Sequence, residues 1–428
     1  MPKNRLFARL VLTSCAVSGI ACGGTSERRG REPHVVVVDT IGDTVRVRTE
    51  RGSVWSGVAT LEPEMSIGVL EGDDPYMFGS IYAMAVDDSG AIYVMDRQVP
   101  VLRKYDAAGH HLFDLGRQGG GPGEYKNPDG GLAVLSDGRV VQRDPGNVRM
   151  NIYGPDGAAL TSWRLPSGGG FNTGRKLFRD ARDNTYTMVL ADRTADVTEW
   201  TYALVPLTPE GQPGDTLFAP TWDFGRPQVS GRTENNSSST GVPFSPTSLW
   251  TFSPAGYFVG SLTTDYRFDL LRPDGVLRIE KNVTPVSVLS EEREEQERRI
   301  TENFRSQFPG WRWNGPPIPD TKPPVRGLYV ADDERIWVQI SQTGVARMSE
   351  EAAAVEEERT GSPQIRFQEP VVFDVFEPDG RYLGQVTTPV GFATSPEPVF
   401  RGEQVWAVTR DDLDVLRVVR YRLRLPTP

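Results

Sequence analysis

Side chains suited to metal binding or nucleophilic attack are scarce in this sequence. The three histidines are His34, His110 and His111, and the two cysteines, Cys15 and Cys22, both precede residue 23. Because His110 and His111 are adjacent, they would point to opposite faces of a strand, whereas a zinc site needs convergent ligands. No P-loop and no G-x-S-x-G motif is present. We therefore expect no catalytic residue and no metal site.

Repeated carboxylates and a run of glycines are the remaining candidates for chemistry. Asp87 and Asp156 lie in turn sequences, where aspartate accepts backbone hydrogen bonds, and neither has the spacing of a calcium loop. Asp96 and Asp144 occupy equivalent positions of a repeat, which favours a structural clamp over an acid–base pair. The glycines at 119–121 are able to form an anion-binding nest, but a connector between repeats is the favoured interpretation.

The composition is that of an acidic globular protein. Of the 428 residues, 38% are hydrophobic and 24% are charged, and the formal net charge is −10. An acidic surface repels phosphate backbones, so we expect no nucleic-acid partner. With no cysteine after Cys22, a disulfide cannot stabilise the folded domain, which must rely on a packed core.

The first 22 residues have the layout of an export signal. A short basic segment, residues 1–9, precedes a mostly apolar run, residues 10–21, that is too short to span a membrane as a helix. The sequence GIACGG ending this run resembles a bacterial lipoprotein signal, in which Cys22 would carry the lipid. Cys15 is the alternative, but it would leave Arg9 inside the apolar segment, and an ordinary cleaved leader is a further reading.

The lipoprotein resemblance also implies a location. Residues 1–22 would be the signal peptide and residues 23–34, which are polar and glycine-rich, a flexible tether. The residue after Cys22 is glycine rather than aspartate, so family rules would place the protein in the outer membrane if the organism has one. We therefore expect an extracytoplasmic, membrane-anchored protein.

A phrase made of a turn, a β-rich run, an aromatic residue and a turn glycine recurs along the chain. The first copy spans residues 85–109 and the second residues 133–157. Four positions match at one offset: Gly90, Asp96, Tyr105 and Gly109 with Gly138, Asp144, Tyr153 and Gly157. Weaker copies follow and bring the short β-rich runs to six: AIYV, RVVQ, TYTM, YFVG, RIWV and QVWA.

Such repetition is typical of a β-propeller, in which four antiparallel strands form each blade. The phrase G-x-I-Y-V-x-D and the connector GRQGGGPGEY at 116–125 resemble NHL-type six-bladed propellers, and the leader extends this resemblance to bacterial six-bladed propeller lipoproteins. We expect one all-β, six-bladed domain over residues 35–425. The last copy lacks a strand, so N-terminal strands (34–40 and 44–49, or alternatively 54–61) should close the ring.

The long insertions of this propeller are expected on one face. In a blade, the A–B and C–D turns lie on one face, the turn face, and the B–C loops and D–A connectors lie on the other, the connector face. The segments 191–199 and 339–370 fall in B–C loops, and 218–246 and 284–325 fall in connectors. Long loops on a rigid scaffold are common binding sites, although a face that only tolerates insertions explains the pattern equally well.

Two insertions have helical patterns, at about 288–308 and 348–359. Ser290 and Ser349 are the expected N-caps, since acidic residues follow each. Ile300, Phe304 and Phe308 recur every four residues and should dock on the propeller. Trp311 and Trp313 follow in a proline-rich run and are the most ligand-like aromatic residues, but a packed cap is favoured.

Binding through the connector face is the function that these features favour over catalysis. The candidate contact residues lie in the loops and connectors: Arg97, Gln98, Gln118, Tyr125, Arg143, Asn147, Trp311 and Trp313. The partner would be an envelope protein, a peptide or a glycan, and the protein a monomer that needs no cofactor. The alternative is a propeller hydrolase of the lactonase kind, or a lyase, with a cation such as calcium at the central axis; histidine scarcity weighs against the lyase.

Overall fold

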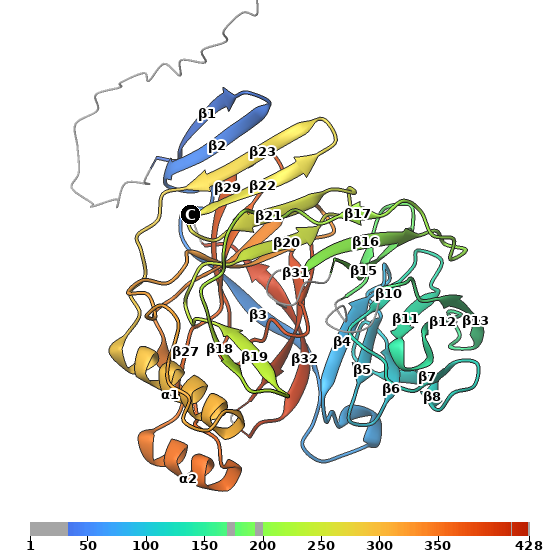
Figure 1. Ribbon diagram of the computed structural model, residues 1–428. Coiled ribbons are helices and arrows are strands. Elements are labelled where there is room, and N and C mark those ends of the chain that lie inside the picture. Colours follow the sequence, from blue (N-terminus) through green and yellow to red (C-terminus); the bar gives the residue numbers. More distant parts are fainter. Residues whose placement is uncertain (1–32, 169–175, 193–199, 412, 427–428) are drawn as a thin grey trace, which may run out of the picture. The chain divides into compact units, whose positions relative to one another are not determined.

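The computed structural model describes residues 33–168, 176–192, 200–411 and 413–426, and it is built mainly of β-strands (Figure 1). The predicted signal peptide, both cysteines, nearly all of the tether and most of the 191–199 insertion lie outside these residues. Within the described ranges, neither helix combines the length and apolar character that crossing a bilayer requires.

Three sheets are four-stranded antiparallel meanders whose strands pair in chain order. The first contains β4 (Ile81–Val86), β5 (Ile92–Asp96), β6 (Val101–Tyr105) and β7 (His111–Leu115). The second contains β10 (Leu132–Val134), β11 (Val140–Asp144), β12 (Arg149–Tyr153) and β13 (Ala159–Arg164). The third contains β14 (Phe178–Arg179), β15 (Thr185–Asp192), β16 (Thr201–Leu207) and β17 (Leu217–Phe218).

Two larger sheets contain the same unit. One joins β20 (Ser248–Phe252), β21 (Phe258–Leu262), β22 (Arg267–Arg272) and β23 (Gly275–Lys281) to the hairpin of β1 (Val35–Ile41) and β2 (Thr44–Arg51). The other joins the meander of β24 (Val325–Val330), β25 (Ile336–Ile340), β28 (Val372–Phe376) and β29 (Tyr382–Thr387) to β3 (Ala59–Ile67), β32 (Leu416–Arg424), β31 (Gln404–Arg410) and β30 (Val399–Arg401).

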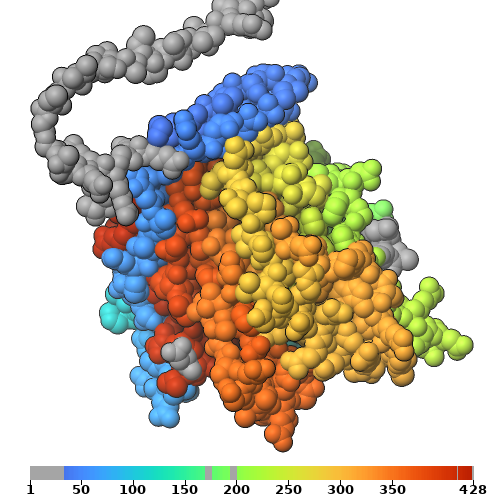
Figure 2. Space-filling model, turned by 90° about the vertical axis from the view of Figure 1, so that its left-hand side faces the viewer, coloured from blue at the N-terminus to red at the C-terminus, as the bar shows by residue number. Residues whose placement is uncertain are grey.

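The N-terminal strands contribute to different sheets. β3 pairs antiparallel with β32, with Thr60 opposite Arg424, and so supplies the fourth strand of the last meander. Of the three segments predicted to close the ring, only 54–61 overlaps this strand. The prediction is wrong for 34–40 and 44–49, because β2 runs parallel to β23 and their hairpin extends the outer edge of another sheet (Figure 2).

The six β-rich runs of the sequence each lie in the second strand of a meander: β5, β11, β15, β21, β25 and β31. All five residues of β5 and of β11 are buried, because neighbouring sheets cover both faces of these strands. First strands of neighbouring meanders contact one another, β4 with β10 and β20 with β24. β30 of the last meander also contacts β4 of the first.

The glycines of the C–D turns pack beneath the outer part of the preceding meander. Gly157 and Gly211 have φ of +82° and +80°, which disfavours any side chain. A Cβ on Gly157 would also lie 2.6 Å from the Phe113 ring of β7, and one on Gly211 would collide with the Trp163 ring of β13. The turn glycine of the repeat is therefore required both by the backbone and by the neighbouring sheet.

The same C–D turns accept hydrogen bonds from cations of the preceding meander. The donor and acceptor pairs are Lys104 with the Pro155 carbonyl, Arg139 with Pro209, Arg272 with Pro378 and Arg420 with Ala107. The bond from Arg420 to the Ala107 carbonyl, with an Nη1–O distance of 2.7 Å, links the final meander to the first.

The aspartate that ends the second strand in the first two meanders clamps the connector that precedes its sheet. Both carboxylate oxygens of Asp96 accept backbone amides, from Gly79 at 2.9 Å and Ser80 at 3.1 Å. Asp144 likewise accepts the amides of Lys126 and Asn127. The prediction that these aspartates are structural clamps is confirmed, since their acceptor positions are used by backbone donors.

Shorter elements complete the described chain: η1 (Asp74–Tyr76), η2 (Pro145–Asn147), β8 (Arg117–Gln118), β9 (Glu124–Tyr125), β18 (Gln228–Arg232), β19 (Ser237–Gly241), β26 (Val345–Ala346), β27 (Phe367–Gln368), α1 (Ser290–Gln307) and α2 (Glu350–Thr360). Ser349 caps α2 as expected, accepting the Ala352 amide at 3.1 Å. Ser290 is the first residue of α1 rather than its cap. The cap is Leu289, whose amide donates to the Glu292 carboxylate at 3.0 Å.

Candidate functional site

The insertions 218–246, 284–325 and 339–370 fold together rather than separately; we call the body that they form the cap. α1 lies beside α2 and near the β18–β19 hairpin (Figure 1). The predicted stripe of Ile300, Phe304 and Phe308 is buried against Val229 of this hairpin. The Phe304 and Trp311 rings lie 4.8 Å apart. The stripe thus docks on another insertion.

Buried ion pairs connect the parts of the cap. The Lys322 side chain is fully buried, and its Nζ lies 2.5 Å from the Glu292 carboxylate of α1 and 3.4 Å from that of Glu369. The Glu295 carboxylate of α1 lies 2.6 Å from the Arg366 guanidinium, just before β27. The pairs of Lys322 with Glu369 and of Glu295 with Arg366 join the insertion 284–325 to the insertion 339–370. Removing one member of a buried pair leaves a buried charge without its partner.

A cavity of 1140 Å³, which we call the connector cavity, lies where the chain enters the innermost strands. Its wall includes the first residues of β4, β20 and β24 and the connector residues 219–226. These are the ends of the first strands opposite the A–B turns, so the cavity is on the side that carries the insertions. Its size is that of a site for a drug-sized ligand or larger.

Both aromatic rings and polar side chains line this wall. Tyr82 of β4 is 37% exposed, and Trp222 and Trp250 are partly exposed. Trp250 of β20 packs edge-to-face on Phe258, with ring centroids 5.6 Å apart. The polar lining side chains include Thr201, Thr221, Asp223, Arg226, Ser248 and Ser395.

A second cavity, of 550 Å³, lies at the opposite ends of the same strands. The two cavities share four lining residues: Met84, Lys176, Phe178 and Glu397. Lys176 and Glu397 form an ion pair, and the Lys176 ammonium lies 5.4 Å from the centroid of the Phe178 ring. This ion pair therefore lies at the boundary between the connector cavity and the second cavity.

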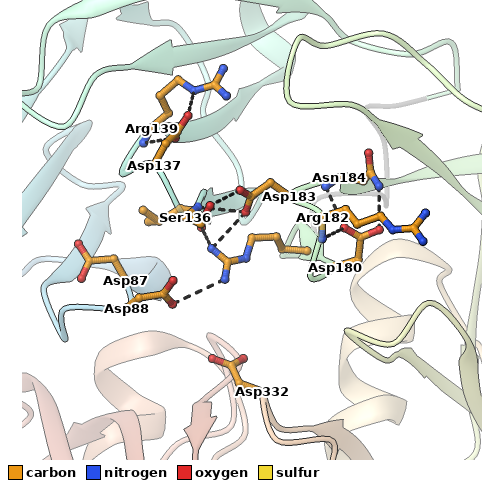
Figure 3. Close-up of polar contacts among 12 residues, drawn as sticks. Asp87, Asp88, Ser136, Asp137, Arg139, Asp180, Arg182, Asp183, Asn184 and Asp332 are labelled. Carbon is orange, nitrogen blue, oxygen red and sulfur yellow. Dashed lines mark hydrogen bonds and ion pairs between the residues drawn. The ribbon is translucent and has the colours of Figure 1, made fainter.

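Charged side chains from the A–B turns surround the second cavity. Asp88 lies 3.6 Å from Arg179 and 3.5 Å from Arg401. Arg179 also pairs with Asp183, and Arg401 pairs with Asp332 at 2.7 Å. Figure 3 shows three carboxylates of this network, Asp88, Asp183 and Asp332, which approach one another from turns of different sheets. Each cation is shared by carboxylates and backbone carbonyls, an arrangement that joins sheets rather than binding a free anion.

The predicted contact residues in the first two meanders differ widely in exposure. Arg97, Gln98 and Gln118 are exposed, and the Arg97 guanidinium stacks on the Tyr82 ring at 4.8 Å, beside the connector cavity. Tyr125 is fully buried and donates to the Leu115 carbonyl at 3.0 Å. Its side chain packs in the interior between two sheets and does not reach the surface.

The remaining predicted residues are held by intramolecular contacts. Asn147 is partly buried and donates to Asp144 at 2.7 Å. Trp311 is buried and donates to the Ser230 carbonyl at 2.8 Å, and Trp313 is partly buried. The structure does not bring Trp311 and Trp313 to the connector cavity, since neither lines it. They pack within the cap, as the favoured interpretation expected.

Arg143 forms a buried pair with Asp129 beside the connector cavity, whose wall includes Gly130. The Arg143 side chain is fully buried, and its Nε lies 3.4 Å from the Asp129 carboxylate. Burial raises the pKa of Asp129 to about 6, although Arg143 and the Gly131 amide oppose the shift. Burial also lowers the pKa of Arg143. The pair therefore has a structural role, and burial disfavours the charged form of both side chains.

This shift predicts a pH-dependent contribution to stability. Because the folded-state pKa of Asp129 exceeds its ordinary value of 3.8, the contribution is complete below pH 3.8 and is lost as the pH rises through about 6. The loss amounts to about 3 kcal/mol, at about 1.4 kcal/mol per pKa unit. Urea unfolding at pH 4 and pH 7 should show this decrease in the free energy of unfolding for the native protein but not for Asp129→Asn. An equal decrease in both proteins would contradict the role given to Asp129.

The other candidates for chemistry have local partners. His110 and His111 pair with Asp106 and Asp114 respectively. The Gly121 amide donates to Glu124 at 2.7 Å, and this bond together with Arg117 lowers the pKa of Glu124. The glycine nest is therefore filled by a carboxylate of its own connector. In the described ranges, no three His, Cys, Asp or Glu side chains group as a metal ion would require.

Sequence reasoning missed Tyr82, Trp222 and Trp250, the rings of the connector cavity. Trp222 lies in the segment PTWDFGRP, an aromatic residue in a proline- and glycine-containing connector like that of Trp311. The same signal was thus available at 220–227, where the side chain does line a cavity.

Comparisons with known proteins give no family. No family model and no curated protein matches the chain. Among solved structures, the chain is similar to a DUF4221 family member from Bacteroides vulgatus, with 9% identity, TM-score 0.49 and coverage of 86% of this chain and 99% of that one. It is also similar to a protein of Bacteroides fragilis described as exported, with 10% identity, TM-score 0.44 and coverage of 90% and 100%.

An enzyme appears among the similar structures as well. Virginiamycin B lyase from Staphylococcus aureus has 9% identity and a TM-score of 0.38, with coverage of 86% of this chain and 100% of that one. Similarity at this level transfers no activity to the chain.

Proposed function

We propose that the protein is an exported, lipid-anchored, six-bladed β-propeller that binds an envelope partner through its connector face. The six-bladed ring is supported by the strand order and by the bond from Arg420 to Ala107, which links the last meander to the first. The export and anchoring proposals are supported by the basic and apolar pattern of residues 1–21 and by Cys22. They leave the folded domain free to meet partners in the cell envelope.

One observation carries the binding proposal: the insertions and the connector cavity lie on the same side of the molecule. The segment 219–226 both enters the cap and lines the cavity. On the opposite side, the A–B turns are short and their charges pair with one another. Among the described residues, the connector side therefore presents a concave, partly aromatic surface, which is the usual form of a binding site.

A blocking substitution tests this proposal. Ser248 is exposed and lines the connector cavity at the start of β20, so Ser248→Arg places a long cation in the cavity without removing a buried contact. In a pull-down from membranes with the intact lipoprotein, we expect the native chain to retain the partner. Ser248→Arg should retain at most about a tenth of that amount.

Ser162→Arg is the matched control, because Ser162 is exposed on β13 and lies outside the connector cavity. It should retain the partner. Equal retention by the two variants would show that the connector cavity is not the binding surface, and melting curves would verify that both variants are folded.

A further inference from the structure

The side chains that line the connector cavity favour one class of ligand. Tyr82, Trp222 and Trp250 come from β4, from the connector before β18 and from β20, so three separate parts of the chain bring a ring to one wall. The same cavity is also lined by residues with hydroxyl groups and by Asp223 and Arg226. Apolar ring faces together with hydrogen-bonding groups match a sugar, whose ring has an apolar C–H face and a rim of hydroxyls.

The Trp222 ring packs against Gly260, a glycine whose backbone conformation other residues can also adopt. Gly260 lies inside β21, and its φ is not positive. A Cβ at this position would lie 2.7 Å from the Trp222 ring. Glycine inside a strand weakens it and marks a close approach by another group. Glycine at position 260 therefore makes room for the Trp222 ring, at a cost to the stability of β21.

The Arg226 guanidinium lies close to Gly241 of the β18–β19 hairpin. A Cβ on Gly241, at the end of β19, would lie 2.5 Å from an Nη atom of Arg226. Arg226 and Asp223 are exposed, and neither forms an ion pair within the described chain. One supplies donors and the other acceptors, the combination that binds adjacent hydroxyl groups of a sugar.

We propose that the connector cavity binds an oligosaccharide, with a sugar ring stacked on Trp222 and hydroxyl groups bonded by Asp223 and Arg226. This inference rests on the proposed binding role of the connector face and names the class of ligand. A peptide is the competing occupant. The lining charges favour a sugar, because Lys176 is paired with Glu397 and Arg326 with Glu369, which leaves one carboxylate and one guanidinium of opposite sign for the ligand.

The test is a glycan array probed with the full-length lipoprotein in a detergent that has no sugar headgroup. Retained oligosaccharides are then titrated against the native protein, Trp222→Ala and Trp222→Phe. We expect at least one retained oligosaccharide, about tenfold weaker binding by Trp222→Ala, and partial recovery by Trp222→Phe, which keeps a ring face. Gly260→Ala should also weaken binding, because it displaces Trp222 while leaving the tryptophan present.

Phe218→Ala is the matched control, since Phe218 is 71% exposed and lies outside the connector cavity. It should bind like the native protein. An array without a retained oligosaccharide overturns the inference, and so does binding that Trp222→Ala leaves unchanged. Capture of a peptide or protein that is sensitive to Ser248→Arg, with an empty array, overturns the inference but leaves the proposed function standing. No capture in either experiment overturns both.

Discussion

Replacing Gly211 by alanine is expected to lower the free energy of unfolding by about 3 kcal/mol, and the same change at Gly256 by about 1 kcal/mol. Both glycines are in turns, with φ of +80° and +86°, so the backbone penalty of a Cβ is the same. They differ in their surroundings. A Cβ on Gly211 collides with the Trp163 ring of the preceding meander, whereas nothing lies within 4 Å of one on Gly256.

The pair of variants separates turn strain from contact between sheets. Urea unfolding followed by tryptophan fluorescence measures both effects, and Trp163 itself reports on the Gly211 site. Glycine occupies both kinds of turn, as at Gly211 and Gly256, but of these two only Gly211, in a C–D turn, contacts a neighbouring outer strand. Equal losses for the two variants would contradict the proposed role of these glycines in docking one sheet on the next.

Removing the Lys322 ammonium should have the next largest effect. Lys322→Met leaves the Glu292 carboxylate buried without its cation and leaves Glu369 with Arg326 alone as a cationic partner, which costs about 3–5 kcal/mol. The Lys322 ammonium also donates to the Gln342 carbonyl at 2.9 Å, a bond that methionine cannot replace. Because these partners belong to different insertions, we expect the cap to open before the sheets unfold. Hydrogen exchange of the α1 amides measures the opening of the cap, and urea unfolding measures the loss of stability.

Arg298→Met is the matched control within the same cap. Arg298 also joins the two helices, through Glu357 at 2.5 Å, but it is 46% exposed and its loss should cost less than about 1 kcal/mol. Adding Glu292→Gln to Lys322→Met should restore part of the lost stability, since it removes the carboxylate that has lost its cation. Unchanged exchange of α1 in Lys322→Met would show that the buried pair does not hold the cap.

The sequence predicts the repeating unit better than it predicts the differences between units. Asp96 and Asp144 are recognisable because both clamp a connector through backbone amides. In later units the clamp changes chemistry: Thr263 accepts the Thr247 amide, and Ser341 donates to the Pro323 carbonyl. The hydrogen bond persists while the residue type does not, which is why the register of the later copies could not be read from the pattern.

Long-range pairing accounts for the other gaps between prediction and structure. The parallel pairing of β2 with β23 joins residues more than two hundred positions apart, and no local pattern encodes it. Arg143 and Tyr125 have the residue types of a binding surface, but stacking of the sheets encloses both. Trp222 has an ordinary connector sequence, and only the folding of 218–246 toward the innermost strands places its ring in the connector cavity.

The pairing of β3 with β32 has a consequence for the order in which the protein is made. β3 is synthesised early, yet its antiparallel partner is the last described strand of the chain, so this sheet cannot be completed during most of translation. Until then β3 keeps an open edge, the kind of nascent surface that invites aggregation. Closure joins the most distant parts of the sequence and is therefore expected to be slow. Ribosome stalling or proteolytic clipping before β32 would leave β3 without its antiparallel partner.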